Sequence, residues 1–199
     1  MNLTRRTLIA AGATLLTAPA FALGSDPRMA DRALGRADAG VTVQEYFSLT
    51  CTHCAAFARD VFPQVRTQLI DTGKIRYIYR DFPLDQVALT AAMVARALPP
   101  ERYEPFVNAL LASQDRWAFV RNANPMDELA KRAALAGMPR NVFDATIADD
   151  ALKTAILAEQ SAGEARYKVD STPTFVFNEK PQSGGLSFEA FSRMVAAAG

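Results

Sequence analysis

The chain has 199 residues, half of them hydrophobic, and carries 22 basic and 21 acidic side chains. This length fits one domain, or one domain with a sizeable insertion, and the apolar content is enough for a buried core. The balanced charge argues against a nucleic-acid-binding protein, which would usually have a basic surface and a high isoelectric point.

The first 22 residues have the layout of an export signal. A polar start with two arginines precedes an apolar run over residues 8–22, which ends in a small-x-small triplet. The run is shorter than the roughly 20 residues of a membrane-spanning helix, so we expect cleavage after Ala22 rather than an uncleaved anchor. Residues 4–9, Thr-Arg-Arg-Thr-Leu-Ile, resemble a twin-arginine signal, although paired arginines also precede ordinary secretory signals.

Cleavage would remove two of the 22 basic residues and no acid, leaving 20 basic and 21 acidic side chains and a net charge of −1. Neither nucleic acid nor an anionic membrane surface is then an expected partner. No cysteine lies at the cleavage site, so we expect no lipid anchor. We expect a periplasmic protein, in an oxidising compartment where two cysteines can pair.

The first predicted strand follows a charged stretch. Residues 23–40 are rich in Asp, Arg, Ala and Gly, and we interpret them as a loose lead-in. Residues 41–47 have the β-branched and aromatic content of a strand. A polar turn over residues 48–50 then leads to Cys51.

An amphipathic helix is predicted from Cys51 onward. Apolar residues recur with a period near 3.6 as far as Leu69, with polar residues between them. Pro63 falls inside this pattern and predicts a kink, because proline removes a helical hydrogen bond. The Asp-Thr-Gly string at residues 71–73 ends the helix, and residues 74–82 predict a second strand.

The middle of the chain, residues 84–168, has no strand-like run. Apolar spacing and the positions of Pro and Gly predict helices at residues 86–98, 103–113, 126–136, 141–147 and 150–167. Strand character returns at residues 174–177. A turn or short edge strand at residues 182–185 follows, and Ser187 caps a last helix.

This order of elements predicts an α/β fold, with a mixed sheet flanked by helices. Residues 41–83 and 150–199 supply the sheet and its flanking helices. The helices of residues 84–149 form an inserted all-helical subdomain.

Cys51 and Cys54 are the only two cysteines. The loop between them is too short to staple a fold, because a structural disulfide gains from closing a long loop. Disulfides are attacked by thiolates, and the N–H groups and aligned dipoles at a helix N-terminus favour an anion at Cys51. We expect Cys51 to face solvent as the nucleophile, and Cys54, one turn deeper, to be the resolving thiol.

His53, the only histidine, lies between the cysteines. Its imidazole, when protonated, and its backbone N–H would both stabilise a Cys51 thiolate and make the disulfide a strong oxidant. An ordinary exposed helix residue is the alternative. A zinc site is a further alternative, but Cys-x-His-Cys supplies three ligands where a structural site needs four. We therefore expect no metal and no cofactor besides the cysteine pair.

Two positions outside the cysteine motif are also candidates. Strand alternation places Glu45 on the side of Val43 and Phe47, where poor hydration would raise its pKa and where it could shuttle protons beneath the cysteines. A solvated strand edge is the alternative. The Thr172–Pro173 bond directly precedes an apolar strand, where a proline marks a strand start or a turn, and this bond can be cis.

Four segments together resemble the DsbA family of thioredoxin-fold oxidoreductases. They are residues 45–54 (EYFSLTCTHC), the kink at Pro63, residues 80–84 (RDFPL) and residues 171–175 (STPTF). The similarity spans about residues 41–199. It implies a thioredoxin-like domain interrupted by a helical one, with re-oxidation by a quinone-linked membrane partner of the DsbB type.

The resemblance also implies roles for single residues. Cys51 corresponds to the family's nucleophile, Cys54 to its second cysteine and Glu45 to its buried acid. Thr172 and Pro173 correspond to a cis-proline loop that faces the cysteines and pairs with the substrate backbone. Thr172, where the best-known members often have Val, and Thr52, where they have Pro, are departures that bear on redox potential and substrate release.

These observations predict a disulfide oxidase that acts on reduced or unfolded exported proteins. A reductase or isomerase with the same site is the alternative, although residues 23–40 are too short for the dimerisation region of a DsbC-type isomerase. A chaperone-like binding module with incidental cysteines is an alternative of another class. We expect a monomer.

Overall fold

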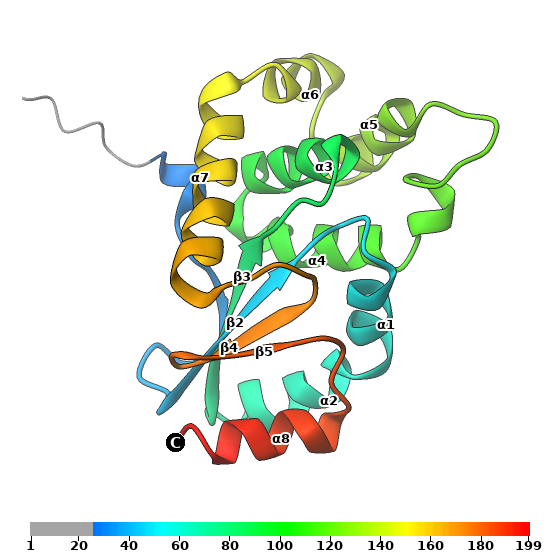
Figure 1. The fold of residues 1–199 in the computed structure, drawn as a ribbon. Coiled ribbons are helices and arrows are strands. Elements are labelled where there is room, and N and C mark those ends of the chain that lie inside the picture. The colour runs from blue at the N-terminus through cyan, green and yellow to red at the C-terminus, as the bar shows by residue number, and fades with distance from the viewer. Residues whose placement is uncertain (1–25) are drawn as a thin grey trace, which may run out of the picture.

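The computed structural model describes residues 26–199, and the predicted export signal lies outside these residues. Five strands form one sheet in the order β1-β3-β2-β4-β5. Strand β2 runs parallel to β3, and the other neighbours are antiparallel. The strands are β1 (Arg32–Leu34), β2 (Val41–Phe47), β3 (Ile75–Asp81), β4 (Thr174–Phe177) and β5 (Lys180–Ser183) (Figure 1).

The expectation of a loose lead-in is wrong for β1. This strand pairs antiparallel with the edge of β3, with Arg32 opposite Tyr79. Arg32 is buried and donates to the carbonyl of Arg96 at 3.1 Å. Gly35, with a φ of 84°, turns the chain where a Cβ would lie 2.5 Å from the carbonyl oxygen of Ile75. A three-residue strand is too short to leave a period in the sequence, and the charged residues around it conceal it.

The predicted helix after Cys51 is present but broken. Helix α1 (Thr52–Asp60) ends where Val61 becomes its C-cap, and α2 (Phe62–Val65) starts with Pro63 in its first turn. A π-helical segment (Arg66–Ile70) completes it before the predicted Asp-Thr-Gly end. Proline is well accommodated in the first turn of a helix, where no intrahelical partner is needed for its nitrogen. Instead of kinking one continuous helix, Pro63 therefore lies in the first turn of a new one.

The helical part lies between β3 and β4 in the chain. It contains α3 (Gln86–Ala97), α4 (Pro100–Leu111), a 3₁₀ turn (Gln114–Arg116), α5 (Pro125–Leu135), α6 (Arg140–Ile147) and α7 (Asp150–Tyr167). Helix α4 begins three residues before its predicted start because Pro100 occupies its first turn. Of residues 26–199, no helix is long and apolar enough to span a bilayer.

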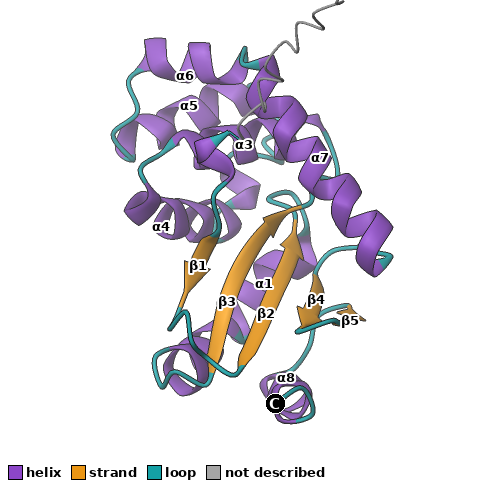
Figure 2. Cartoon of the chain, turned by 90° about the vertical axis from the view of Figure 1, so that its left-hand side faces the viewer, coloured by secondary structure: helices purple, strands orange, loops and turns teal. Residues whose placement is uncertain are grey.

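Helices cover both faces of the sheet. In Figure 2, α1 lies behind the sheet and α7 crosses in front of its upper end, while α3, α5 and α6 gather beyond the strand ends. Helix α8 (Phe188–Ala196), capped by Ser187 as predicted, packs against α2 at the opposite end. This is the thioredoxin-like α/β fold with a helical insertion that the sequence predicts.

A buried charge cluster joins the helical part to the sheet. Arg96 of α3 is fully buried and contacts Asp81 of β3 at 2.5 Å and Glu159 of α7 at 3.1 Å. Tyr103 of α4 donates to the same Asp81 carboxylate at 3.3 Å. Removing one partner of such a cluster leaves a buried unpaired charge, which costs about 3–5 kcal/mol. The cluster therefore fixes α3, α4 and α7 against β3.

Candidate active site

Cys51 is the N-cap residue of α1, at the point where the chain leaves β2. A short turn over residues 48–50 separates the two elements, and the Cys51 N–H donates to the Ser48 carbonyl at 3.1 Å. The Cys51 Sγ takes the place of a capping oxygen and accepts from the backbone N–H of Cys54 at 3.4 Å. The strand end and the helix start together fix the sulfur at an anion-favouring position.

The two cysteines are not joined by a disulfide in this structure, and both are buried. Cys51 is 7% exposed and Cys54 is 0% exposed, so the order of accessibility is as predicted. The expectation that Cys51 faces solvent freely is wrong. The cis-proline loop covers it from the side, and the Cys51 Sγ lies 3.2 Å from the carbonyl oxygen of Thr172.

The pKa values of the two thiols move in opposite directions. The pKa of Cys51 falls to about 5, because the Cys54 thiol and the backbone N–H groups of Cys54 and His53 hydrogen-bond to its sulfur. The neighbouring Thr172 side chain adds to this fall, and together these effects outweigh burial, which acts in the opposite direction. Burial raises the pKa of Cys54, and the hydrogen bond to Cys51 raises it further. At neutral pH, Cys51 is the thiolate and Cys54 is the thiol.

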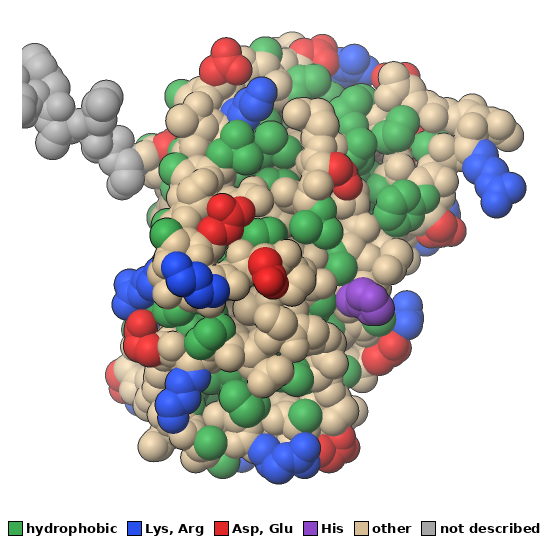
Figure 3. Space-filling view, viewed as in Figure 1, with side chains coloured by type: hydrophobic (Ala, Val, Ile, Leu, Met, Phe, Trp, Pro, Cys, Tyr) green, Lys and Arg blue, Asp and Glu red, His purple; other side chains and the backbone are tan. Residues whose placement is uncertain are grey.

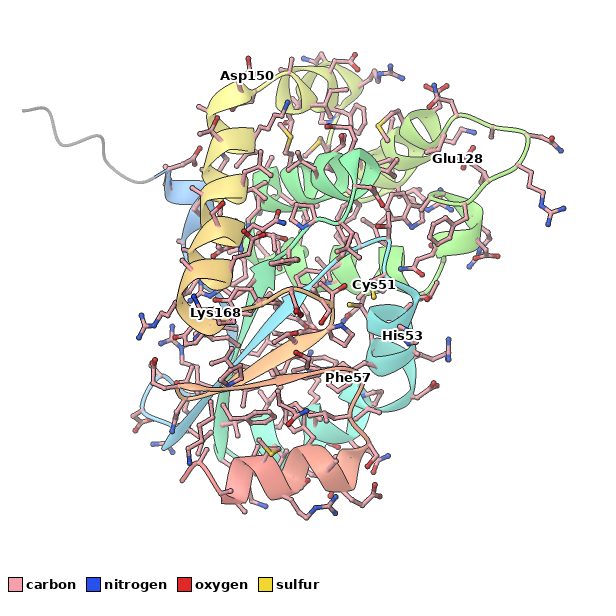
Figure 4. The ribbon with its side chains drawn as sticks, viewed as in Figure 1. Cys51, His53, Phe57, Glu128, Asp150 and Lys168 are labelled. Atoms are coloured by element: carbon pink, nitrogen blue, oxygen red, sulfur yellow. The ribbon has the colours of Figure 1, made fainter. Side chains whose placement is uncertain are left out.

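His53 contributes to Cys51 through its backbone rather than its ring. Its side chain is exposed, and in Figure 4 the imidazole points away from the sulfur atoms into solvent. The backbone N–H is the His53 group that lowers the pKa of Cys51. Because the exposed ring points into solvent, it contributes little to the stability of the thiolate in this arrangement.

Glu45 lies in the sheet beneath the cysteines. It is 4% exposed, and Tyr77 of β3 donates its hydroxyl proton to Glu45 Oε2 at 2.6 Å. Burial raises the pKa of Glu45 to about 7, partly offset by the Tyr77 hydrogen bond, and the Cys51 charge adds to the rise. The predicted rise is therefore present, and the solvated-edge alternative is wrong. A carboxyl with a pKa near neutrality can both give and take a proton.

The Thr172–Pro173 bond is cis and precedes β4, as the resemblance to the DsbA family implies. This loop is held by a hydrogen bond from the Gly184 N–H to the Pro173 carbonyl at 2.8 Å. Among residues 26–199, the buried Thr172 hydroxyl has no hydrogen-bond partner. This hydroxyl can donate a hydrogen bond to the Cys51 sulfur when that sulfur carries a negative charge.

Three residues of the site were not predicted from the sequence. Tyr77, which bonds Glu45, lies on the buried side of β3, where strand alternation could have placed it. Asp85 caps α3 and accepts from the Thr50 hydroxyl at 2.7 Å. Gln114 donates to the carbonyls of Leu49 and Cys51 at 2.9 and 3.0 Å. Nothing in the local sequence around Gln114 signals a contact 63 residues away.

Metal-binding groups are sparse around these residues. Within residues 26–199, no group of three or more His, Cys, Asp or Glu side chains is arranged to hold a metal ion.

Comparison with known proteins identifies the family. A family model described as thioredoxin matches residues 28–197. The solved structure of alpha-DsbA1 from Wolbachia pipientis is 30% identical, and the alignment covers 85% of this chain and 91% of that one with a TM-score of 0.77. The chain belongs to the DsbA family of thioredoxin-fold oxidoreductases.

Other relatives extend this similarity. A Rickettsia felis protein, named as a protein-disulfide oxidoreductase, is 31% identical over 166 residues, which is 83% of this chain and 59% of that protein. The chain thus spans about three fifths of the length of this curated relative. BdbD of Bacillus subtilis, at 17% identity and a TM-score of 0.72, shares the fold. The Cys51–Cys54 pair lies within residues 28–197, the part matched by the thioredoxin family model.

Proposed function

We propose that the protein is an exported disulfide oxidase that introduces disulfide bonds into reduced periplasmic proteins through Cys51 and Cys54. The observation that carries this proposal is the position of the Cys51 sulfur as the N-cap of α1, where it accepts from the Cys54 N–H at 3.4 Å. This position lowers the pKa of Cys51 to about 5. A sulfur that is stable as an anion is a good leaving group, and it favours the reduced form of the pair. Both effects drive the protein to give up its disulfide.

The reaction begins with the oxidised pair. A substrate thiolate attacks the Cys51 sulfur, forming a mixed disulfide and breaking the Cys51–Cys54 bond, so that Cys54 leaves as a thiolate. Burial disfavours that anion, and Glu45, with a pKa of about 7, is placed to protonate it. A second substrate thiolate then attacks the substrate sulfur of the mixed disulfide, and Cys51 leaves as a stable thiolate. The substrate is oxidised and the enzyme is reduced.

The cis-proline loop is proposed to bind the substrate. Thr172 and Pro173 lie beside the Cys51 sulfur, at the start of β4. A peptide joined to Cys51 would run past this loop, and extended peptides bind through backbone hydrogen bonds. Figure 3 shows hydrophobic side chains gathered over the helical part of the face drawn, a surface suited to unfolded chains.

Re-oxidation requires an electron acceptor, and we propose a quinone-linked membrane partner of the DsbB type. We also propose that residues 1–22 direct export of the protein to the periplasm. We propose that the exported protein is a monomer. A fusion of these residues to a reporter that folds only after export tests this part. Reporter activity that is independent of Arg5 and Arg6 would favour the ordinary secretory route over the twin-arginine route.

The equilibrium constant of the Cys51–Cys54 pair against glutathione decides the direction of exchange. A potential near that of strong oxidants, about −120 mV, supports the oxidase, and one well below about −200 mV would favour a reductase or isomerase. Oxidation of a dithiol peptide by a Cys51→Ala variant tests the third class. Full activity of this variant would leave the redox role of Cys51 without support.

A further inference from the structure

The turn that carries Cys51 is held from the helical part at two points. Asp85, the N-cap of α3, accepts from the Thr50 hydroxyl at 2.7 Å. Gln114, which follows α4, reaches the same turn with its side-chain amide. The second contact is the one that touches the backbone of Cys51.

Gln114 uses both N–H bonds of its amide. Its Nε2 lies 2.9 Å from the carbonyl oxygen of Leu49 and 3.0 Å from that of Cys51. Gln114 is 7% exposed and Leu49 is 2% exposed, so water cannot readily replace this donor. Buried carbonyls need partners, and losing one costs about 1–3 kcal/mol.

The Cys51 carbonyl is also the start of helix α1. It accepts the first helical hydrogen bond, from the Ala55 N–H at 3.1 Å. Because Gln114 fixes this carbonyl, it fixes the rotation of the Cys51 backbone relative to the helix. That rotation determines whether the Cys51 sulfur meets the N–H of Cys54, now 3.4 Å away.

The main chain of Gln114 organises the neighbouring surface loop. Its carbonyl accepts from the N–H groups of Ala118 at 2.9 Å and Phe119 at 3.0 Å. Phe119 is 51% exposed, so this loop meets whatever approaches the site from the helical part. One residue thus connects that loop to the backbone of Cys51.

We propose that Gln114 is a positioning residue: its amide, presented by the helical part, holds the turn before α1 so that the Cys51 sulfur stays aligned with the N–H groups of the helix. This inference builds on the proposed redox role of Cys51. It gives the helical part a direct share in the reactivity of the site.

The test compares two substitutions in the same buried segment. Gln114→Met keeps the length of the side chain and removes both hydrogen bonds to the turn. Trp117→Phe removes one buried hydrogen bond, from Trp117 Nε1 to the Leu110 carbonyl at 2.9 Å, and leaves Cys51 untouched. Thiolate absorbance of the reduced variants against pH gives the pKa of Cys51, and thermal unfolding gives their stability.

We expect Gln114→Met to raise the pKa of Cys51 by about half a unit, the size of a helix-terminus effect. The equilibrium constant with glutathione should then fall about threefold. Trp117→Phe should lower the melting temperature and leave the pKa of Cys51 unchanged.

A folded Gln114→Met protein with the parent pKa would overturn the inference, and so would an equal shift in Trp117→Phe. If Gln114→Met does not fold, Gln114→Asn replaces it. Its shorter amide can reach one carbonyl at most, so an unchanged pKa in that variant would also overturn the inference. A parent protein with the lowered pKa that reduces substrates instead of oxidising them would refute the proposed function and leave this role of Gln114 standing.

Discussion

The first turn of α1 separates two regions with opposite effects on the pKa of a thiol. The rim consists of Cys51, the N–H groups of His53 and Cys54, and Thr172. The floor consists of Cys54, Glu45 and Tyr77. Hydrogen-bond donors dominate the rim and lower the pKa of Cys51 to about 5, whereas burial dominates the floor and raises the pKa values of Cys54 and Glu45.

Burial alone does not set the reactivity of a thiol in this site. Cys51 and Cys54 are both less than a tenth exposed. What separates them is the number of donors that point at each sulfur, because a charged sulfur without donors pays the full cost of leaving water. The rim therefore favours the thiolate of Cys51, and the floor favours the protonated forms of Cys54 and Glu45.

The largest expected effect is on activity, from removing either sulfur. Cys51→Ala should reduce peptide oxidation to background, because the rim loses its only attackable sulfur. Cys54→Ala should leave a Cys51 thiolate that forms mixed disulfides but cannot release them. Mass spectrometry after mixing with a cysteine peptide checks this. Stable adducts at residue 54 of Cys51→Ala would reverse the roles of rim and floor.

The next largest effect is on stability, from the floor. Glu45 has a folded pKa of about 7 against an unfolded value near 4.3. A raised carboxyl pKa means that its contribution is full below the unfolded value and is lost as pH rises through about 7. Glu45→Gln should therefore be more stable than the parent at pH 8, by about 3 kcal/mol, and equal to it near pH 4.

Urea unfolding of parent and variant between pH 4 and pH 8 measures this difference. Asp60→Asn is the matched control, because Asp60 is an exposed carboxyl on α1, and it should leave the pH profile unchanged. A stability difference for Glu45→Gln that does not vary with pH would mean that the floor carboxyl is hydrated.

A smaller effect on stability comes from the rim. The folded pKa of Cys51 lies below its unfolded value near 8.5, so the thiolate contribution is present above the unfolded pKa and is lost as pH falls through about 5. The oxidised protein has no thiol to titrate.

The free energy of unfolding of the reduced form should therefore rise relative to that of the oxidised form between pH 5 and pH 8. The expected rise is about 2 kcal/mol after allowing for solvent screening. At pH 8 the reduced form should unfold at the higher urea concentration. A stability difference between the two forms that stays constant over this range would mean that the rim does not stabilise a Cys51 thiolate.

The smallest effect is expected from the imidazole. His53→Ala keeps the backbone N–H that faces Cys51, so the pKa of Cys51 should rise by less than about one unit. Arg59→Ala, which removes an exposed charged side chain of α1, is the matched control. A rise of two units or more in His53→Ala alone would transfer the main stabilising role from the amides to the ring.

The sequence predicts the layout of both regions because their signals are local. The change of period at Cys51 marks a helix start, and alternation along residues 41–47 puts Glu45 inside. The partners from distant segments are harder to predict. Gln114 meets Cys51 through the packing of the helical part, and β1 joins the sheet through three residues with no period of their own. Such contacts depend on tertiary packing, which a local pattern does not contain.

The central claim is that the rim holds Cys51 as a thiolate, and thiolate absorbance of the reduced Cys54→Ala protein against pH tests it most directly. That variant isolates the Cys51 sulfur. It keeps the backbone donors and loses the Cys54 thiol, so the pKa should remain well below that of a free cysteine, near 8.5. A midpoint at or above 8.5 would contradict the claim.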